Sequence, residues 1–314
     1  MALIRHRCCP NLPHLELSER RPIFSLPSTA TIKPSNDDAI TIADLEKLAI
    51  LGYGNGGTVY KVCHKATSAT FALKIIRSNI DINTRRRALT EISILRRATD
   101  CPNVVRFHGC FEKPIGELAI LMEYMDGGSL ETALATHGKF SEEKLFLVAR
   151  SILNGLAYLH AHNIVHRDIK PGNILVNTKG EVKIADFGVS KLMNHTFEMC
   201  YSYVGTNAYM SPERFNPDAY GGSYNGFAAD IWSFGLTLFE LFVGHFPFLE
   251  PGQRPNWATL VCGICFNDPP TMPETASPEL RNFIACCLKK EPSERWSTTQ
   301  LLNHPFMCKD FITC

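Results

Sequence analysis

The strongest constraint on the fold of this 314-residue chain is a pair of polar segments near its middle. His166–Asn173 reads H-R-D-I-K-P-G-N, and Asp186–Gly188 reads D-F-G. Together these segments supply two carboxylates, a carboxamide and an ammonium group. Carboxylate and amide oxygens are ligands that Mg2+ prefers, and a further carboxylate can accept a proton from a hydroxyl group. A fold for this chain must therefore bring these separated side chains together.

The combination predicts phosphoryl transfer, a reaction that needs little covalent help from a protein but much positioning. Asp168 is expected to orient the attacking hydroxyl and accept its proton, and Lys170 to neutralise charge on the moving group. Asn173 and Asp186 are predicted to hold the Mg2+ ions that bridge the phosphates of ATP. Each residue alone has an ordinary alternative as part of a surface loop, so the prediction depends on the set.

A glycine-rich segment precedes this pair in the chain, and Leu51–Val59 contains the pattern G-x-G-x-x-G-x-V. Glycines let the backbone approach phosphate oxygens and present its N–H groups to them. A dinucleotide-binding fold would continue into a helix, whereas Val59–Val62 is typical of a strand, so we expect a β-hairpin over the nucleotide. The nucleotide-binding residues predicted here are Leu51, Gly52, Gly54, Asn55, Gly56, Gly57 and Val59.

A lysine and a glutamate follow the glycine-rich segment at a spacing that suits a buried ion pair. Lys74 is the charged residue of an otherwise apolar strand-like run, Thr70–Ile76, and Glu91 lies in a run with helical spacing of Ala88, Ile92 and Leu95. Taken alone, Lys74 is a snorkelling surface lysine. With Glu91 as its partner, it is expected to direct its ammonium group at the α- and β-phosphates.

The chain divides into regions of different composition. Residues 1–43 contain Pro10, Pro13, Pro22, Pro27 and Pro34 without sustained periodicity, which predicts a disordered tail. Strand-like runs and glycine turns dominate residues 44–125, and helical periodicity dominates 126–307, which leaves 308–314 as a C-terminal tail. We therefore predict an α+β fold with two lobes, a β-rich N-lobe with one helix and a mainly α-helical C-lobe.

Two helices of the larger lobe are predicted in particular. One follows Ser141 and buries the face formed by Leu145, Val148, Ala149, Ile152, Leu153, Leu156 and Leu159. The other, Asp230–Val243, is apolar almost all round, so it is expected at the centre of the lobe. Because Glu240 interrupts it and the run is shorter than the ~20 residues of a membrane span, a buried helix is the better interpretation.

Charge and cysteine content narrow the classes of partner. Lys and Arg number 32 against 31 Asp and Glu, which gives no reason to expect a nucleic acid or a membrane as the main partner. No apolar core of signal-peptide length precedes Pro10 and Pro13, so we expect a protein that stays inside the cell. In such a chain the 12 cysteines are expected to be mostly reduced thiols.

The motifs, in this order, resemble the eukaryotic protein kinase family over about residues 44–307. The resemblance implies that Met122 is the gatekeeper beside the adenine and that Glu123–Met125 is the hinge that receives it, which adds Met122, Glu123 and Met125 to the nucleotide site. It also implies that Glu213, in the A-P-E position, forms an ion pair with Arg295.

Within that family, Met122–Leu130 and Val204–Arg214 are most similar to mitogen-activated protein kinase kinases, and the Thr-x5-Ser spacing of Thr196 and Ser202 is similar to the plant members. The resemblance implies an enzyme that phosphorylates Thr and Tyr of a Thr-x-Tyr motif in a mitogen-activated protein kinase. It further implies activation by an upstream kinase that phosphorylates Thr196 and Ser202. A phosphate on either residue could pair with Arg167.

Other features bear on partners and location. A basic cluster, Arg5–Arg7, and Leu15–Leu17 are similar to the family's docking motif, although seven residues separate them. The expected location is the cytoplasm, with the nucleus left open. Two alternatives stay open: a Ser/Thr kinase at another level of the cascade, which Lys170 would suit, and a pseudokinase scaffold. A pseudokinase usually lacks Lys74, Asp168 or Asp186, and this chain has all three.

Overall fold

The computed structural model describes residues 40–54, 57–77, 82–113, 116–192, 206–220, 224–249 and 256–309. The predicted docking motif, Asn55, Gly56, Thr196 and Ser202 lie outside the described residues, as do residues 310–314. The description begins at Ile40, and a short 3-10 helix, Ile42–Asp44, leads into the first strand.

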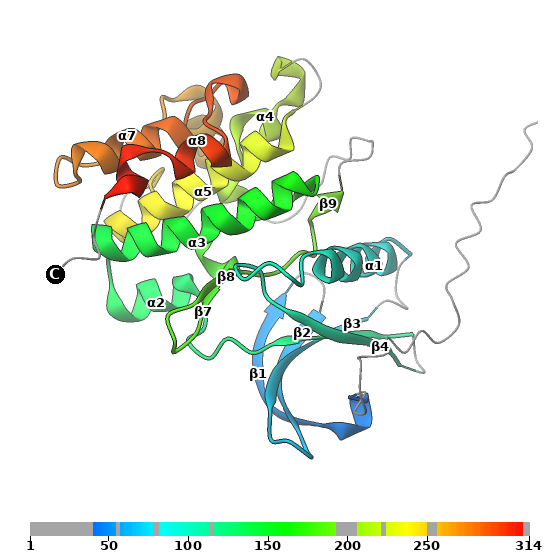
Figure 1. Ribbon diagram of the computed structural model, residues 1–314. Helices are drawn as coiled ribbons and strands as arrows, with labels where there is room; N and C mark the ends of the chain where they lie inside the picture. Colours follow the sequence, from blue (N-terminus) through cyan, green and yellow to red (C-terminus); the bar gives the residue numbers. More distant parts are fainter. Residues whose placement is uncertain are drawn as a thin grey trace, which may run out of the picture. The chain divides into compact units, whose positions relative to one another are not determined.

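The N-terminal part is a five-stranded antiparallel sheet with the order β1-β2-β3-β5-β4, and helix α1 lies beside it (Figure 1). The predicted hairpin of the glycine-rich segment is formed by β1 and β2. The elements are β1 Leu45–Gly54, β2 Gly57–His64, β3 Thr70–Ile76, α1 Ile82–Arg97, β4 Phe107–Glu112 and β5 Leu118–Glu123. The sheet precedes the helices in sequence, as predicted.

Short elements carry the loops between the sheet and the large helices. The strands pair antiparallel, β6 with β9 and β7 with β8. Their bounds are β6 Ile164–Val165, η2 Pro171–Asn173, β7 Ile174–Val176, β8 Val182–Ile184 and β9 Lys191–Leu192. The two predicted polar segments therefore lie in the turns that follow β6 and β8.

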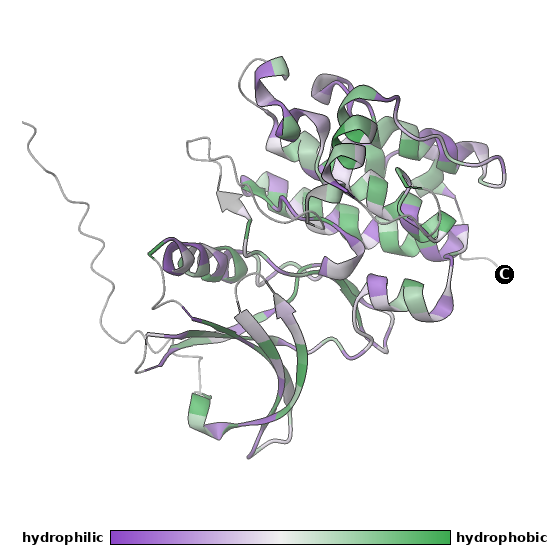
Figure 2. Ribbon diagram, turned by 180° about the vertical axis from the view of Figure 1, so that it is seen from behind, coloured by the Kyte–Doolittle hydropathy of each residue, from purple (hydrophilic) through white to green (hydrophobic). Residues whose placement is uncertain are grey.

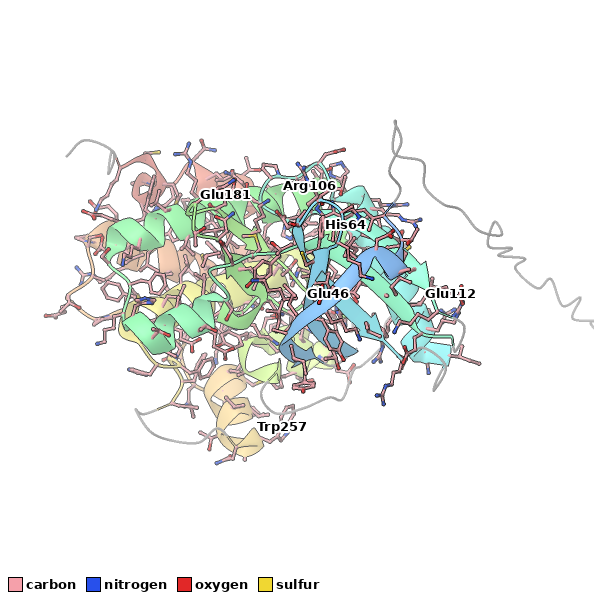
Figure 3. The ribbon with its side chains drawn as sticks, turned by 90° about the horizontal axis from the view of Figure 1, so that it is seen from below. Glu46, His64, Arg106, Glu112, Glu181 and Trp257 are labelled. Carbon is pink, nitrogen blue, oxygen red and sulfur yellow. The ribbon has the colours of Figure 1, made fainter. Side chains whose placement is uncertain are left out.

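The C-terminal part is mainly helical (Figure 1). Its helices are α2 Leu130–His137, α3 Glu142–Ala161, α4 Pro212–Phe215, α5 Gly226–Val243, α6 Trp257–Val261, α7 Pro278–Cys287 and α8 Thr298–Leu302. Its shorter turns are η3 Thr206–Tyr209, η4 Pro217–Tyr220, the π-helical η5 Cys262–Phe266, η6 Pro292–Glu294 and η7 Pro305–Cys308. Figure 3 shows Trp257, on α6, at the edge of this part.

Helix α3 confirms the predicted helix after Ser141, whose side chain accepts the N–H of Lys144 and so caps the helix. All the apolar positions predicted to form its buried face are buried. They belong to a large hydrophobic cluster that also includes residues of α1, α5 and α7. Figure 2 shows much of the ribbon of the helical part in green, the colour of hydrophobic residues.

Helix α5 confirms the second predicted helix and begins four residues earlier, at Gly226. Asn225 caps it by accepting the N–H groups of Phe227 and Ala228. By length and composition the helix could cross a membrane, but 78% of it is buried inside the domain, as in the core helix of a soluble protein. Its position explains why it is apolar almost all round.

Candidate active site

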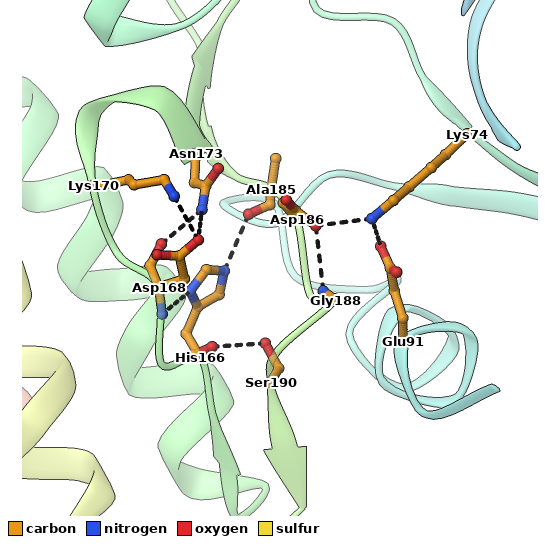
Figure 4. Close-up of polar contacts among 10 residues, drawn as sticks. All are labelled: Lys74, Glu91, His166, Asp168, Lys170, Asn173, Ala185, Asp186, Gly188 and Ser190. Atoms are coloured by element: carbon orange, nitrogen blue, oxygen red, sulfur yellow. Dashed lines mark hydrogen bonds and ion pairs between the residues drawn. The ribbon is translucent and has the colours of Figure 1, made fainter. Parts of the chain in front are cut away.

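Lys74, Glu91 and Asp186 meet at the face of the sheet that α1 covers (Figure 4). Nζ of Lys74, on β3, lies 2.6 Å from Oε1 of Glu91 on α1 and 2.8 Å from Oδ1 of Asp186. Lys74 is only 5% exposed, which rules out the snorkelling surface lysine. The three residues come from the N-lobe sheet, its helix and the loop after β8, so the site joins both lobes.

The charges of this cluster stabilise one another. Burial favours neutral Lys74, but the carboxylates of Asp186 and Glu91 outweigh it and raise the pKa of Lys74 above its ordinary value. Burial would likewise raise the pKa of Asp186, but the charge and hydrogen bond of Lys74 lower it to about 2. Lys74 and Asp186 are therefore both ionised at neutral pH, as an ATP-binding cation and a metal-binding anion must be.

The sheet register places the glycine-rich hairpin next to Lys74. Gly52 on β1 pairs with Val59 on β2, Val59 pairs with Lys74, and Lys74 pairs with Ile120 on β5. Residues directly opposite each other in antiparallel strands project to the same face, so Val59 shares the face of Lys74. Leu51 lies in the irregularity between the Ile50 and Gly52 pairs and is 45% exposed.

Two glycines of the hairpin are needed for different reasons. A Cβ on Gly57 would lie 1.9 Å from the carbonyl oxygen of Ile75, so the sheet itself excludes a side chain there. A Cβ on Gly52 would meet nothing within 4 Å, so its surroundings leave room for a ligand. Both glycines were predicted to bind phosphate, but packing against β3 is sufficient to explain Gly57.

The residues predicted in the catalytic loop, His166–Asn173, also converge (Figure 4). Oδ2 of Asp168 accepts hydrogen bonds from Nζ of Lys170 at 2.8 Å and from Nδ2 of Asn173 at 2.7 Å. Nδ2 of Asn173 also donates to the backbone carbonyl of Asp168 at 2.8 Å. Asp168 is thus an oriented carboxylate beside a cation, the arrangement expected for accepting a proton from a hydroxyl.

The side-chain oxygens of Asn173 and Asp186 are suitable ligands for Mg2+. The amide nitrogen of Asn173 is engaged with Asp168, and Oδ1 of Asp186 is engaged with Lys74 and the N–H of Gly188. Each residue therefore keeps an oxygen for which the described part of the chain provides no hydrogen-bond partner. The backbone carbonyl of Asn173 accepts the N–H of Ala185, the residue before Asp186, and this bond holds Asn173 and Asp186 near each other. One or two protein oxygens, completed by phosphates and water, are typical of Mg2+.

A buried aspartate on α5 holds the catalytic loop in place. Oδ2 of Asp230 accepts the N–H of His166 at 2.9 Å, and Oδ1 accepts the N–H of Arg167 at 2.8 Å. Nε2 of His160 lies 3.0 Å from Oδ2 of Asp230. These bonds hold Arg167 at a φ of 72°, a left-handed conformation that residues other than glycine rarely adopt.

His166 connects the catalytic loop to the D-F-G segment. Its Nε2 lies 3.1 Å from the carbonyl oxygen of Ala185, and its Nδ1 lies 3.3 Å from the backbone nitrogen of Asp168. Because a carbonyl oxygen can only accept, Nε2 carries the proton and Nδ1 accepts the N–H of Asp168. The ring of Phe187 packs edge-on against His166 and is buried. The two polar segments are thereby fixed to one another.

The gatekeeper Met122 and the hinge residues Glu123 and Met125 are held by contacts with the sheet, the hydrophobic cluster and Lys183. Met122 pairs with Ala72 in the sheet, two residues from Lys74, and packs against the large hydrophobic cluster. The carboxylate of Glu123 binds Nζ of Lys183, with its oxygens at 2.9 and 2.8 Å. The backbone N–H of Glu123 donates to the carbonyl of Arg106 at 3.0 Å. Met125 is 5% exposed.

Glu213 and Arg295 form the ion pair that the resemblance implied. The two distances between guanidinium nitrogens and carboxylate oxygens are 2.5 and 2.8 Å, and both side chains are fully buried. Arg167 is different, because its Nε is buried and has no hydrogen-bond partner among the described residues. The guanidinium group of Arg167, directly before Asp168, is therefore suited to bind an anion.

Sequence reasoning missed three residues that support the site. Asp230 was predicted only as the first residue of an apolar helix. A carboxylate buried in such a helix needs hydrogen-bond partners, so its presence there was itself a sign of a supporting role. Lys183, which binds Glu123, stands between the buried Val182 and Ile184 on β8, and nothing in this local pattern indicates the contact. Arg214 donates from Nη1 to the carbonyl of Arg167 at 2.8 Å, and nothing in the local sequence indicates that contact.

Comparison with known proteins agrees with this geometry. Residues 45–307 match the protein kinase domain family. The chain is 55% identical to mitogen-activated protein kinase kinase 9 of Arabidopsis thaliana over 99% of this chain and 100% of that protein. It is 53% identical to mitogen-activated protein kinase kinase 7 of the same plant, over 98% and 99%. Mitogen-activated protein kinase kinase 1c of the moss Physcomitrium patens is 42% identical over 90% and 81%.

Proposed function

This chain belongs to the protein kinases and, among them, to the mitogen-activated protein kinase kinases of plants, and from that premise we propose its finer specificity. It transfers the γ-phosphoryl group of Mg-ATP to both Thr and Tyr of a Thr-x-Tyr motif in a mitogen-activated protein kinase. Its relatives are named mitogen-activated protein kinase kinases, that is, kinases that act on mitogen-activated protein kinases.

The observation that carries the proposal is the convergence of the charged residues. Lys74, paired with Glu91, touches Asp186, and Asp168 touches both Lys170 and Asn173. The charged side chains predicted to carry phosphoryl transfer thus lie in contact with one another in two groups, which supports an active kinase over a pseudokinase scaffold.

Each of these residues has a distinct task. Lys74 binds the α- and β-phosphates, and Glu91 keeps the ammonium group in place. Asp168 orients the acceptor hydroxyl and takes its proton, while Lys170 offsets negative charge on the transferred group. Asn173 and Asp186 would hold Mg2+, which neutralises charge on the bridging phosphate oxygens when bound.

The proposed activation step is phosphorylation of Thr196 and Ser202 by an upstream kinase. The buried and unpartnered Nε of Arg167 supports it, because a phosphate would supply the anion that this cation lacks among the described residues. Arg167 directly precedes Asp168, so such a pair would act next to the proposed base.

The substrate proposal is tested with a variant that carries Thr196→Asp and Ser202→Glu. The variant is incubated with a panel of catalytically inactive mitogen-activated protein kinases, and the modified residues are mapped by mass spectrometry. We expect label on both Thr and Tyr of one Thr-x-Tyr motif. The same protein with Asp168→Ala is the matched control and is expected to label neither, while still binding ATP.

Two results would contradict the proposal. Label on Thr alone would favour a Ser/Thr kinase at another level of the cascade. Full turnover by Asp168→Ala would remove Asp168 from the mechanism. For the activation step, Thr196→Ala with Ser202→Ala is expected to abolish stimulation by an upstream kinase; undiminished stimulation would refute that assignment.

We also propose that Arg5–Arg7 and Leu15–Leu17 bind the substrate kinase and that the protein acts in the cytoplasm, with the nucleus left open. The basic and aliphatic character of the two segments supports the first point. Deleting residues 1–20 is expected to raise the KM for the kinase substrate without changing the KM for ATP. Imaging of the tagged full-length chain tests the location, and absence from the nucleus would limit it to the cytoplasm.

A further inference from the structure

Arg214, on α4, reaches the catalytic loop, His166–Asn173, from a helix that follows Thr196 and Ser202 in sequence. Its Nη1 donates a hydrogen bond of 2.8 Å to the backbone carbonyl of Arg167, 47 residues away. The accepting carbonyl belongs to the residue directly before Asp168. Arg214 ends the Val204–Arg214 segment that carries the family resemblance, but no role in the reaction was predicted for it from the sequence; in the structure it contacts the backbone at the proposed base.

This contact completes the support of one peptide unit. The carbonyl oxygen of the Arg167–Asp168 peptide accepts from Arg214, and its N–H donates to Nδ1 of His166 at 3.3 Å. Because a peptide unit is planar, holding its oxygen and its N–H fixes the plane from which Asp168 extends. The φ of 72° at Arg167 makes such support necessary, since few residues adopt this conformation unaided.

The charge of Arg214 is not explained by an ion pair. Within the described residues, no carboxylate pairs with the guanidinium group of Arg214 or of Arg167. Burial, together with repulsion from Arg167, lowers the pKa of Arg214 below its ordinary value. A partly buried cation in this place is costly to keep, so simple packing of α4 is a poor reason for it.

We propose that Arg214 is a positioning residue for phosphoryl transfer, which holds the Arg167–Asp168 peptide and thereby directs the Asp168 carboxylate at the acceptor hydroxyl. It acts through the backbone and does not touch the substrate. The same hydrogen bond joins α4 to the catalytic loop. This inference rests on the role proposed for Asp168.

The test uses the full chain with Thr196→Asp and Ser202→Glu, into which Arg214→Met and Arg214→Lys are introduced. Small displacements of a catalytic group reduce rates by up to about 100-fold, so we expect Arg214→Met to lower kcat by about 10- to 100-fold. The KM for ATP is expected to stay within about twofold, since the phosphate-binding residues are untouched. Arg214→Lys, which keeps a charged donor, is expected to recover most of the lost kcat.

Glu213→Gln is the matched control, because it weakens the anchoring of α4 through Arg295 and leaves the Arg214 guanidinium in place. It is expected to lower the unfolding midpoint more than Arg214→Met does and kcat less. If Arg214→Met does not fold, Arg214→Gln replaces it, with an expected loss in kcat of at least about tenfold at unchanged KM for ATP.

The inference is overturned if the Arg214 variants retain full kcat, or if kcat falls only in proportion to stability across the Arg214 and Glu213 variants. Asp168→Ala, measured in parallel, separates the two claims. An inactive Asp168→Ala beside a fully active Arg214→Met removes the positioning role alone. An active Asp168→Ala removes the role of Asp168, and the inference with it.

Discussion

The Glu213–Arg295 pair provides the sharpest test of how the C-terminal helices hold α4. Arg295 donates to both carboxylate oxygens of Glu213, at 2.5 and 2.8 Å. It also donates to the backbone carbonyls of Lys289 at 2.6 Å, Lys290 at 2.9 Å and Ala228 at 3.2 Å. Both side chains are fully buried. Arg295→Met would therefore leave a buried carboxylate without its counter-charge and three carbonyls without this donor.

Removing one partner of a buried pair costs about 3–5 kcal/mol, because the remaining charge stays desolvated. In a domain of this size about 2–4 °C of melting temperature corresponds to 1 kcal/mol, so the midpoint is expected to fall by at least about 6 °C. Equilibrium urea denaturation, followed by tryptophan fluorescence, measures the free energy of unfolding directly.

Two further variants make this prediction specific. In Glu213→Gln with Arg295→Met the uncompensated charge is gone, so the double variant is expected to be more stable than Arg295→Met alone. Arg85→Met removes the exposed pair of Arg85 with Glu112 and is expected to cost no more than about 1 kcal/mol. A loss below about 1 kcal/mol for Arg295→Met, or a double variant less stable than it, would refute the reasoning.

The remaining predictions concern the nucleotide side of the site. Lys74→Met is expected to abolish measurable phosphoryl transfer, because the variant lacks the phosphate-binding cation, and to lower the unfolding midpoint, because Glu91 and Asp186 lose their counter-charge; retained turnover would contradict this. Because the pKa of Asp186 is lowered to about 2, its stabilising contribution is complete above about pH 4 and is lost as the pH falls toward 2. Acid unfolding of Asp186→Asn should therefore depend less steeply on pH than that of the parent, and equal slopes would count against it. Gly57→Ala, whose Cβ would lie 1.9 Å from the Ile75 carbonyl, is expected to raise the KM for ATP and lower stability far more than Gly52→Ala, and equal effects would exclude the packing explanation.

The sequence by itself determined several of the elements and the chemistry, because both are encoded locally. The 3.6-residue spacing from Leu145 to Leu159 predicted the buried face of α3, and the continuation into Val59–Val62 predicted a hairpin rather than a helix. Asp168, Asn173 and Asp186 were identifiable because phosphoryl transfer needs these groups in a recognisable local order, whatever the fold around them.

Tertiary structure alone decided which distant groups support those residues. Asp230, Arg214 and Lys183 act through hydrogen bonds to residues 47 to 64 positions away, and no local spacing reveals such partners. It also decided that Gly57 is required by the carbonyl of Ile75, which lies on a neighbouring strand. The physical reason is common to all four: burial and hydrogen bonding depend on what folding brings into contact, and residue type limits that choice without fixing it.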